Sequence, residues 1–156
     1  MSEAKNITYS EPMSGPSDLS MTFMDFFPDI PTGTINPGDT WIADDSVSSE
    51  SASAKVYVKT KSENRYEGNE KINGKDCIKI TSNLSGTEVI LTQSEGTDVK
   101  VSGPFTGTAV IYFSSADGYF VKYSVTTKLK GIVDVLSMAM TIPIEIETTS
   151  DTNVIN

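Results

Sequence analysis

The chain has 156 residues, the size of one ordinary domain, and 37% of them are hydrophobic. It contains 12 basic and 21 acidic residues, so its formal net charge is −9, which argues against a nucleic-acid partner or an anionic membrane surface. Histidine is absent, which excludes histidine-dependent nucleophilic sites and histidine-ligated zinc, and a single cysteine excludes an intrachain disulfide.

The N-terminal part divides into a polar arm and a short amphipathic segment. Residues 1–18 are polar and contain proline, glycine and serine, a composition typical of a flexible arm, so we expect a single domain over residues 19–156. Neither a secretory signal nor an apolar run of about 20 residues is visible in the chain. The apolar spacing over Leu19–Phe27 predicts a short helix that ends at Pro28. We interpret it as a plug on the core, with a partner-binding helix as the alternative.

Two loops are predicted next. Pro31–Asp39 contains two prolines and two glycines, which is typical of a loop. Trp41 follows, and we expect it to anchor the core. The segment Asp44–Ser53 is rich in serine and acidic residues, which predicts an exposed loop.

From Ala54 onward the apolar residues recur with a period of two, which predicts β-strands. Asn73-Gly74 is the strongest hairpin signal and predicts a primed turn with positive φ at Gly74. Asp117-Gly118 predicts another tight turn. The predicted strand segments are 54–59, 65–72, 75–81, 89–91, 98–102, 108–114 and 119–127.

The segment 132–146 is ambiguous. Its even positions are apolar except for Asp134, which indicates one long strand, or a loop followed by a strand. A helical stripe over 132–141 also fits, formed by Val135, Leu136, Ala139 and Met140. The alternation persists for longer than the helical pattern, so a strand is favoured.

These signals together predict an all-β fold. Turns recur every 8–12 residues and no connection is long enough for a crossover helix, so we expect an antiparallel meander. Such a sheet must bury its apolar side, and we therefore expect a strongly curved sheet, either a half-barrel or a closed barrel, with the short N-terminal helix beside it.

No catalytic, metal or cofactor site emerges from the motifs. Glu145 and Glu147 share one strand face, which indicates a solvated pair, and Asp44-Asp45 lacks the calcium-loop pattern. The Gly68–Lys75 segment departs from a phosphate-binding loop in its glycine spacing. Cys77 begins an alternating strand and is interpreted as a small buried hydrophobe. We expect no enzyme activity.

A set of short, turn-like motifs occurs across residues 26–125. In chain order they are Phe27-Pro28 to Pro31, Pro37-Gly38-Asp39-Thr40-Trp41, Tyr66-Glu67-Gly68, Asn73-Gly74-Lys75 with Cys77 and Ile80, and Tyr112-Phe113 with Asp117-Gly118. This order resembles a family of uncharacterised prokaryotic secreted or lipoprotein β-domains, some of which are compared with the half-barrels of periplasmic lipoprotein carriers. The resemblance implies a cell-envelope location and an apolar ligand, and it implies no catalytic residue.

Two hypotheses about function follow. A helix over Leu19–Phe27 would span only about 13 Å, too little to cover a sheet several strands wide. The first hypothesis is therefore a non-enzymatic extracytoplasmic domain that binds a lipid or other apolar molecule. Its candidate ligand-binding residues form an apolar row rich in adaptable methionine: Leu136, Met138, Met140 and Ile142. The alternative is a structural or adhesive cell-surface module with a filled core and no small-molecule ligand.

Overall fold

The computed structural model describes residues 8–11, 15–18, 30–52, 54–94 and 96–154. Within these residues the chain forms two antiparallel sheets and no α-helix. The smaller sheet is a hairpin of β1 (Thr8–Glu11) and β2 (Gly15–Asp18), so part of the predicted N-terminal arm is paired. The helix predicted over Leu19–Phe27 lies outside the described residues.

The larger sheet is a meander of six strands, each antiparallel to the next, as the sequence predicted. It is open, because β3 and β8 form its two edges, so the closed barrel was wrong. The 3-10 turn η1 (Leu136–Met138) connects the last two strands. The strands are β3 (Thr40–Glu50), β4 (Ala54–Ile72), β5 (Lys75–Ser94), β6 (Thr97–Ser114), β7 (Tyr119–Val135) and β8 (Met140–Asn153).

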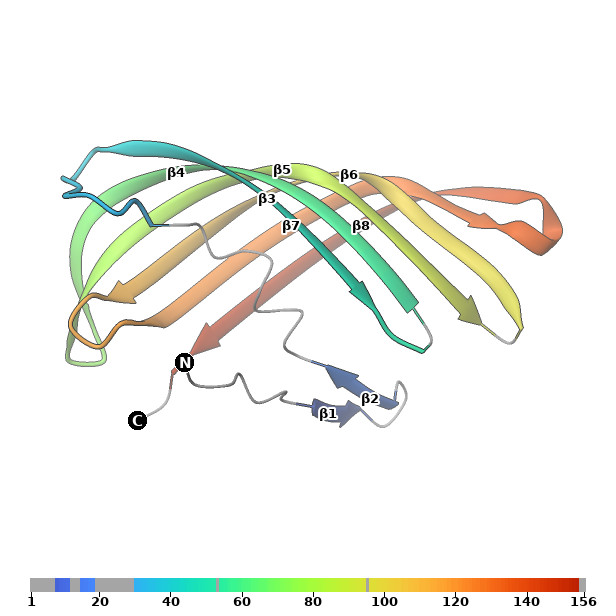
Figure 1. The fold of residues 1–156 in the computed structure, drawn as a ribbon, viewed down its shortest axis with the longest axis horizontal. Helices are drawn as coiled ribbons and strands as arrows, with labels where there is room; N and C mark the ends of the chain where they lie inside the picture. The colour runs from blue at the N-terminus through green and yellow to red at the C-terminus, as the bar shows by residue number, and fades with distance from the viewer. Residues whose placement is uncertain (1–7, 12–14, 19–29, 53, 95, 155–156) are drawn as a thin grey trace.

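The four central strands are much longer than predicted, with 19, 20, 18 and 17 residues in β4 to β7. Their length corrects the expected turn spacing of 8–12 residues. The predicted segments 75–81 and 89–91, for example, both belong to β5. Small and polar residues separate these segments in the sequence, but backbone pairing continues through them. Figure 1 shows the long strands arching along their length.

The loop predicted over Asp44–Ser53 was also wrong, because most of it belongs to edge strand β3. Asp44 lies opposite Lys61 in the β3–β4 register, and pairing continues to Glu50. An exposed edge is typically polar, since charge opposes pairing with another chain. The two edge strands contain no Lys or Arg and six acidic residues: Asp44, Asp45, Glu50, Glu145, Glu147 and Asp151.

Both predicted tight turns are present. Asn73 and Gly74 have φ of 51° and 79°, so both occupy the left-handed region that a two-residue type I′ hairpin requires. The hairpin prediction is therefore confirmed. Gly118 has φ of 74°, and its amide donates to the Ser114 carbonyl oxygen at 2.8 Å, which closes the turn between β6 and β7.

One face of the sheet, here called the inner face, holds the main core. Tyr66, Ile80, Ile111 and Tyr123 lie in one row across β4 to β7, and the two isoleucines are completely buried. The partly buried Trp41 packs against this core, as predicted. The buried core residues are Val58, Ile80, Leu84, Phe105, Ala109, Ile111, Tyr123, Val125 and Leu129.

Glycines on the inner face occupy positions where neighbouring strands leave no room for a side chain. A Cβ at Gly86 would overlap the Lys59 carbonyl oxygen of β4. A Cβ at Gly103 would lie 2.5 Å from the Gly131 Cα on β7. Glycine in a strand interior often marks a bend or a close backbone approach, so these positions allow the sheet to curve.

Cys77 lies in a second, smaller cluster with Tyr112 and Val121. Its side chain is buried, as predicted, and burial raises the pKa of its thiol. A raised pKa disfavours the reactive thiolate. The structure thus agrees with the interpretation of Cys77 as a small packing residue.

Candidate functional site

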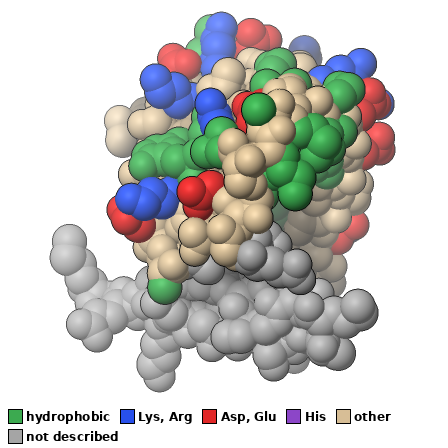
Figure 2. Space-filling model, turned by 90° about the vertical axis from the view of Figure 1, so that its right-hand side faces the viewer, with side chains coloured by type: hydrophobic (Ala, Val, Ile, Leu, Met, Phe, Trp, Pro, Cys, Tyr) green, Lys and Arg blue, Asp and Glu red, His purple; other side chains and the backbone are tan. Residues whose placement is uncertain are grey.

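The four candidate residues lie at and just after the tip of the β7–β8 hairpin. Leu136 and Met138 belong to η1, and Met140 and Ile142 begin β8. Their exposed fractions are 59%, 67%, 42% and 42%, respectively. Figure 2 faces the end of the molecule where this tip lies, and it shows hydrophobic side chains gathered on that surface. All four residues are therefore available for contact.

The sequence predicted that these four residues form one strand row, and this prediction was wrong. The chain reverses between Val135 and Met140, which lie opposite each other in the register. Ala139 makes this reversal with φ of 50°. The turn contains no Gly, Pro, Asn or Asp, so the sequence lacked the usual turn signal. The alternative prediction of a helix in this segment was also wrong, because only the single 3-10 turn η1 is helical there.

Replacing Ala139 with glycine should stabilise the domain. A left-handed conformation costs an alanine about 1–2 kcal/mol, and glycine avoids that cost while losing part of the gain to its greater freedom when unfolded. We expect a net gain of about 0.5–1 kcal/mol in the free energy of unfolding, measured by urea denaturation. Ala109→Gly, in the buried middle of β6, is the control and should destabilise. A loss of stability in Ala139→Gly would contradict the turn geometry.

The apolar surface continues from β8 across the inner face. Ile142 lies opposite Val133 of β7, and Met140 lies opposite Val135. The register extends these two rows to β6 and β5. We call this surface the apolar end: Ile90, Val99, Val101, Val133, Val135, Met140 and Ile142. Its isoleucines, valines and methionine are half-buried or exposed. The buried core thus gives way to an accessible apolar surface near the hairpin tips, which Figure 1 places at one end of the sheet.

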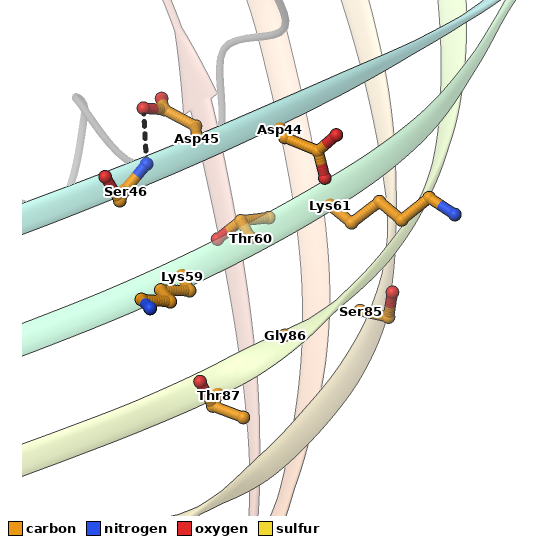
Figure 3. A pocket seen from close by; sticks show the side chains of 9 residues that line it. All are labelled: Asp44, Asp45, Ser46, Lys59, Thr60, Lys61, Ser85, Gly86 and Thr87. Atoms are coloured by element: carbon orange, nitrogen blue, oxygen red, sulfur yellow. Dashed lines mark hydrogen bonds between the residues drawn. The ribbon is translucent and has the colours of Figure 1, made fainter.

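Open hollows also lie elsewhere on the described part of the sheet. The first, of about 460 Å³, spans β3, β4 and β5. Figure 3 shows its lining, in which the acidic Asp44 and Asp45 stand near Lys59 and Lys61 around Gly86. The second, of about 540 Å³, lies beside Gly103 and Gly131. None of the four candidate residues lines either hollow, and charges of both signs line each of them.

The paired carboxylates of β8 are solvated, as predicted. Glu145 and Glu147 are 52% and 64% exposed, and both lie near the Lys128 ammonium, at 2.6 and 4.0 Å. The hydrogen bond from Lys128 lowers the pKa of Glu145, which favours the ionised form. Across the described ranges, no group of three or more His, Cys, Asp or Glu could hold a metal ion.

Comparison with family models, curated proteins and solved structures gives no match to this chain. Among the residues that the structure describes, no helix is long and apolar enough to cross a bilayer. The geometry of the chain itself must therefore support any functional proposal.

Glu88 is one residue of interest that the sequence analysis did not single out. It is half-buried on the inner face of β5, opposite Val58 of β4 and Gly103 of β6. The sequence contained a signal for this placement, because Glu88 keeps the period-two phase of Leu84 and Ile90. Burial raises its pKa above the usual range of a glutamic acid.

Proposed function

We propose that this chain is a non-enzymatic, extracytoplasmic domain that binds a lipid or another apolar molecule on the apolar end and the adjoining hairpin tip with Leu136 and Met138. The observation that supports this proposal is the exposure of Leu136, Met138, Met140 and Ile142 beside the half-buried valines of β6 and β7. An extended apolar patch on a soluble domain commonly marks an interaction site. Covering it would contribute about 25 cal/mol for each Å² removed from water.

The shape of the site fits a ligand that lies on the surface. At the opposite end of the inner face Ile80 and Ile111 are completely buried, and Phe105 and Leu129 in its middle are 6% and 7% exposed. The apolar end, by contrast, is accessible. Met138 and Met140 have flexible thioether side chains, which adapt to apolar ligands of different shapes.

The extracytoplasmic location and the half-barrel likeness belong to this proposal. Their support is the order of short motifs that resembles the envelope β-domains, together with an open, arched antiparallel sheet. The filled core supports a second candidate function, a structural or adhesive surface module that has no small-molecule ligand. The two candidates differ in whether the apolar end binds a small molecule.

Titration with a neutral apolar dye distinguishes the two candidates. We expect Nile red fluorescence to rise and saturate in the presence of the wild-type protein. Met138→Asp and Ile142→Asp should each weaken binding about tenfold or more, since each places a charge where the dye must exclude water. In the wild-type protein the side chains of Met138 and Ile142 are 67% and 42% exposed, so the fold should tolerate the change.

Ile42→Asp is the matched control for this titration. Ile42 is 60% exposed but lies on the outer face of β3, away from the apolar end. We expect this variant to bind the dye like the wild type. Absence of saturable binding by the folded wild-type protein would overturn the proposal and leave the structural module. Equal losses in all three variants would show that the dye binds apolar surface without preference.

A further inference from the structure

Five of the six strands, β4 to β8, carry a single charged side chain on the inner face, and the edge strand β3 adds Asp45 opposite Thr60. Inward positions alternate along each strand, and the register identifies them as even residues 54–66 and 78–92, odd residues 99–111 and 123–135, and even residues 140–152. Among these positions Glu88 is the only Asp, Glu, Lys or Arg. Every other charge of these strands lies on the outer face or near a turn.

Glu88 stands between the buried core and the apolar end. Val58, opposite it on β4, is only 8% exposed, and Gly103, opposite it on β6, offers no side chain. One step further along the strands lies the row Ile90, Val101, Val133 and Ile142 of the apolar end. With strands about 4.8 Å apart, this row extends about 14 Å from β5 to β8. That length suits a short alkyl chain.

Among the residues that the structure describes, no basic group pairs with the Glu88 carboxylate. No hydrogen bond or ion pair joins it to any part of the chain that the structure describes. In contrast to Glu88, glutamates such as Glu63 and Glu145 form ion pairs, and they lie on the solvated outer face. A carboxylate that is half-buried without a partner is unfavourable, and a bound cation would relieve the cost.

We propose that Glu88 holds the head group of the ligand and that the ligand is a positively charged amphiphile, an alkyl chain that ends in an ammonium group. This inference rests on the proposed function and adds the chemistry of the ligand. The alkyl chain lies along the apolar end, and the ammonium group pairs with the Glu88 carboxylate. The net charge of −9 acts in the same direction, because it attracts cations and repels fatty-acid anions.

Calorimetric titration with three ligands of equal chain length tests this inference. The ligands are decylammonium, neutral decyl glucoside and decanoate, each below its micelle concentration, at neutral pH and low salt. We expect the wild-type protein to bind decylammonium at least tenfold more tightly than decyl glucoside, and decanoate most weakly. Glu88→Gln should remove the preference for the cation and leave the affinity for decyl glucoside unchanged.

Glu63→Gln is the matched control, because it removes the same charge from the exposed outer face of β4. This variant should keep the wild-type preference. A preference for decylammonium that survives Glu88→Gln, or equal affinity of the wild type for all three ligands, would overturn the role of Glu88 but not the proposed function. If none of the three ligands bound, both the role of Glu88 and the proposed function would be overturned. The wild-type comparison requires no variant, so the inference can fail even if Glu88→Gln does not fold.

Discussion

Ile111→Ala is expected to lower the free energy of unfolding by about 3–4 kcal/mol, as removal of a large buried aliphatic side chain does. Ile111 is completely buried near the C-terminal end of β6, between Ile80 and Tyr123 on the neighbouring strands. Few atoms could move to fill the cavity, since both neighbours belong to long paired strands. Urea denaturation followed by circular dichroism measures the change.

The control for this substitution is Ile42→Ala. It removes the same atoms from a side chain that is 60% exposed, and it should cost less than about 0.5 kcal/mol. Equal costs at the two positions would contradict the assignment of the core to the inner face. A large cost at Ile42 alone would place the core on the opposite face.

Gly103→Ala should destabilise the domain by about 2–3 kcal/mol, although it adds only one methyl group. The new Cβ would lie 2.5 Å from the Gly131 Cα and 2.6 Å from the Lys130 carbonyl oxygen. These are backbone atoms of β7, so relief requires a strand to shift, and overpacking of this kind typically costs 1–3 kcal/mol. The thermal or urea unfolding transition of the variant measures the loss.

Gly33→Ala is the matched control for Gly103→Ala. Gly33 lies in the loop before β3, and a Cβ there would meet nothing within 4 Å. The substitution should leave stability unchanged or raise it slightly, because alanine restricts the unfolded chain. If Gly103→Ala were as stable as Gly33→Ala, the close approach of β6 and β7 at Gly131 would not exist in solution.

The fold class could be predicted because two signals are local. Period-two alternation, as in Ile78 and Ile80, marks a strand that is buried on one face, and Asn73-Gly74 marks a tight hairpin. Both survive in the structure. The absence of helix-length connections then left an antiparallel meander as the simplest arrangement.

The strand lengths and one edge could not be predicted from the same signals. Strand β5 continues through Ser82 and Gly86 because its neighbours supply backbone hydrogen-bond partners on both sides, a long-range condition. Strand β3 is serine-rich and acidic because it lies at an edge, so its composition imitates a loop. The turn at Ala139 uses an uncommon conformation for alanine and leaves no sequence signal.

The candidate site was predictable in part. The alternation identified Met140 and Ile142 as one apolar row, but only the hairpin could place Leu136 and Met138 on a turn before that strand. The exposure of these residues depends on the sheet being open at β8, which no local pattern reveals. Glu88 was visible in the alternation, but its isolation from other charges required the full register.

The central claim is that the apolar end with its adjoining hairpin tip, and no other surface, binds an apolar ligand. Methyl NMR spectra recorded during titration with decyl glucoside test this claim residue by residue. We predict saturable shifts at Val101, Val133 and Met140 of the apolar end, and none at the buried Ile111 or the outer-face Ile42. Shifts at Ile42 without shifts at the apolar end, or no saturable shift at any methyl group, would contradict the account.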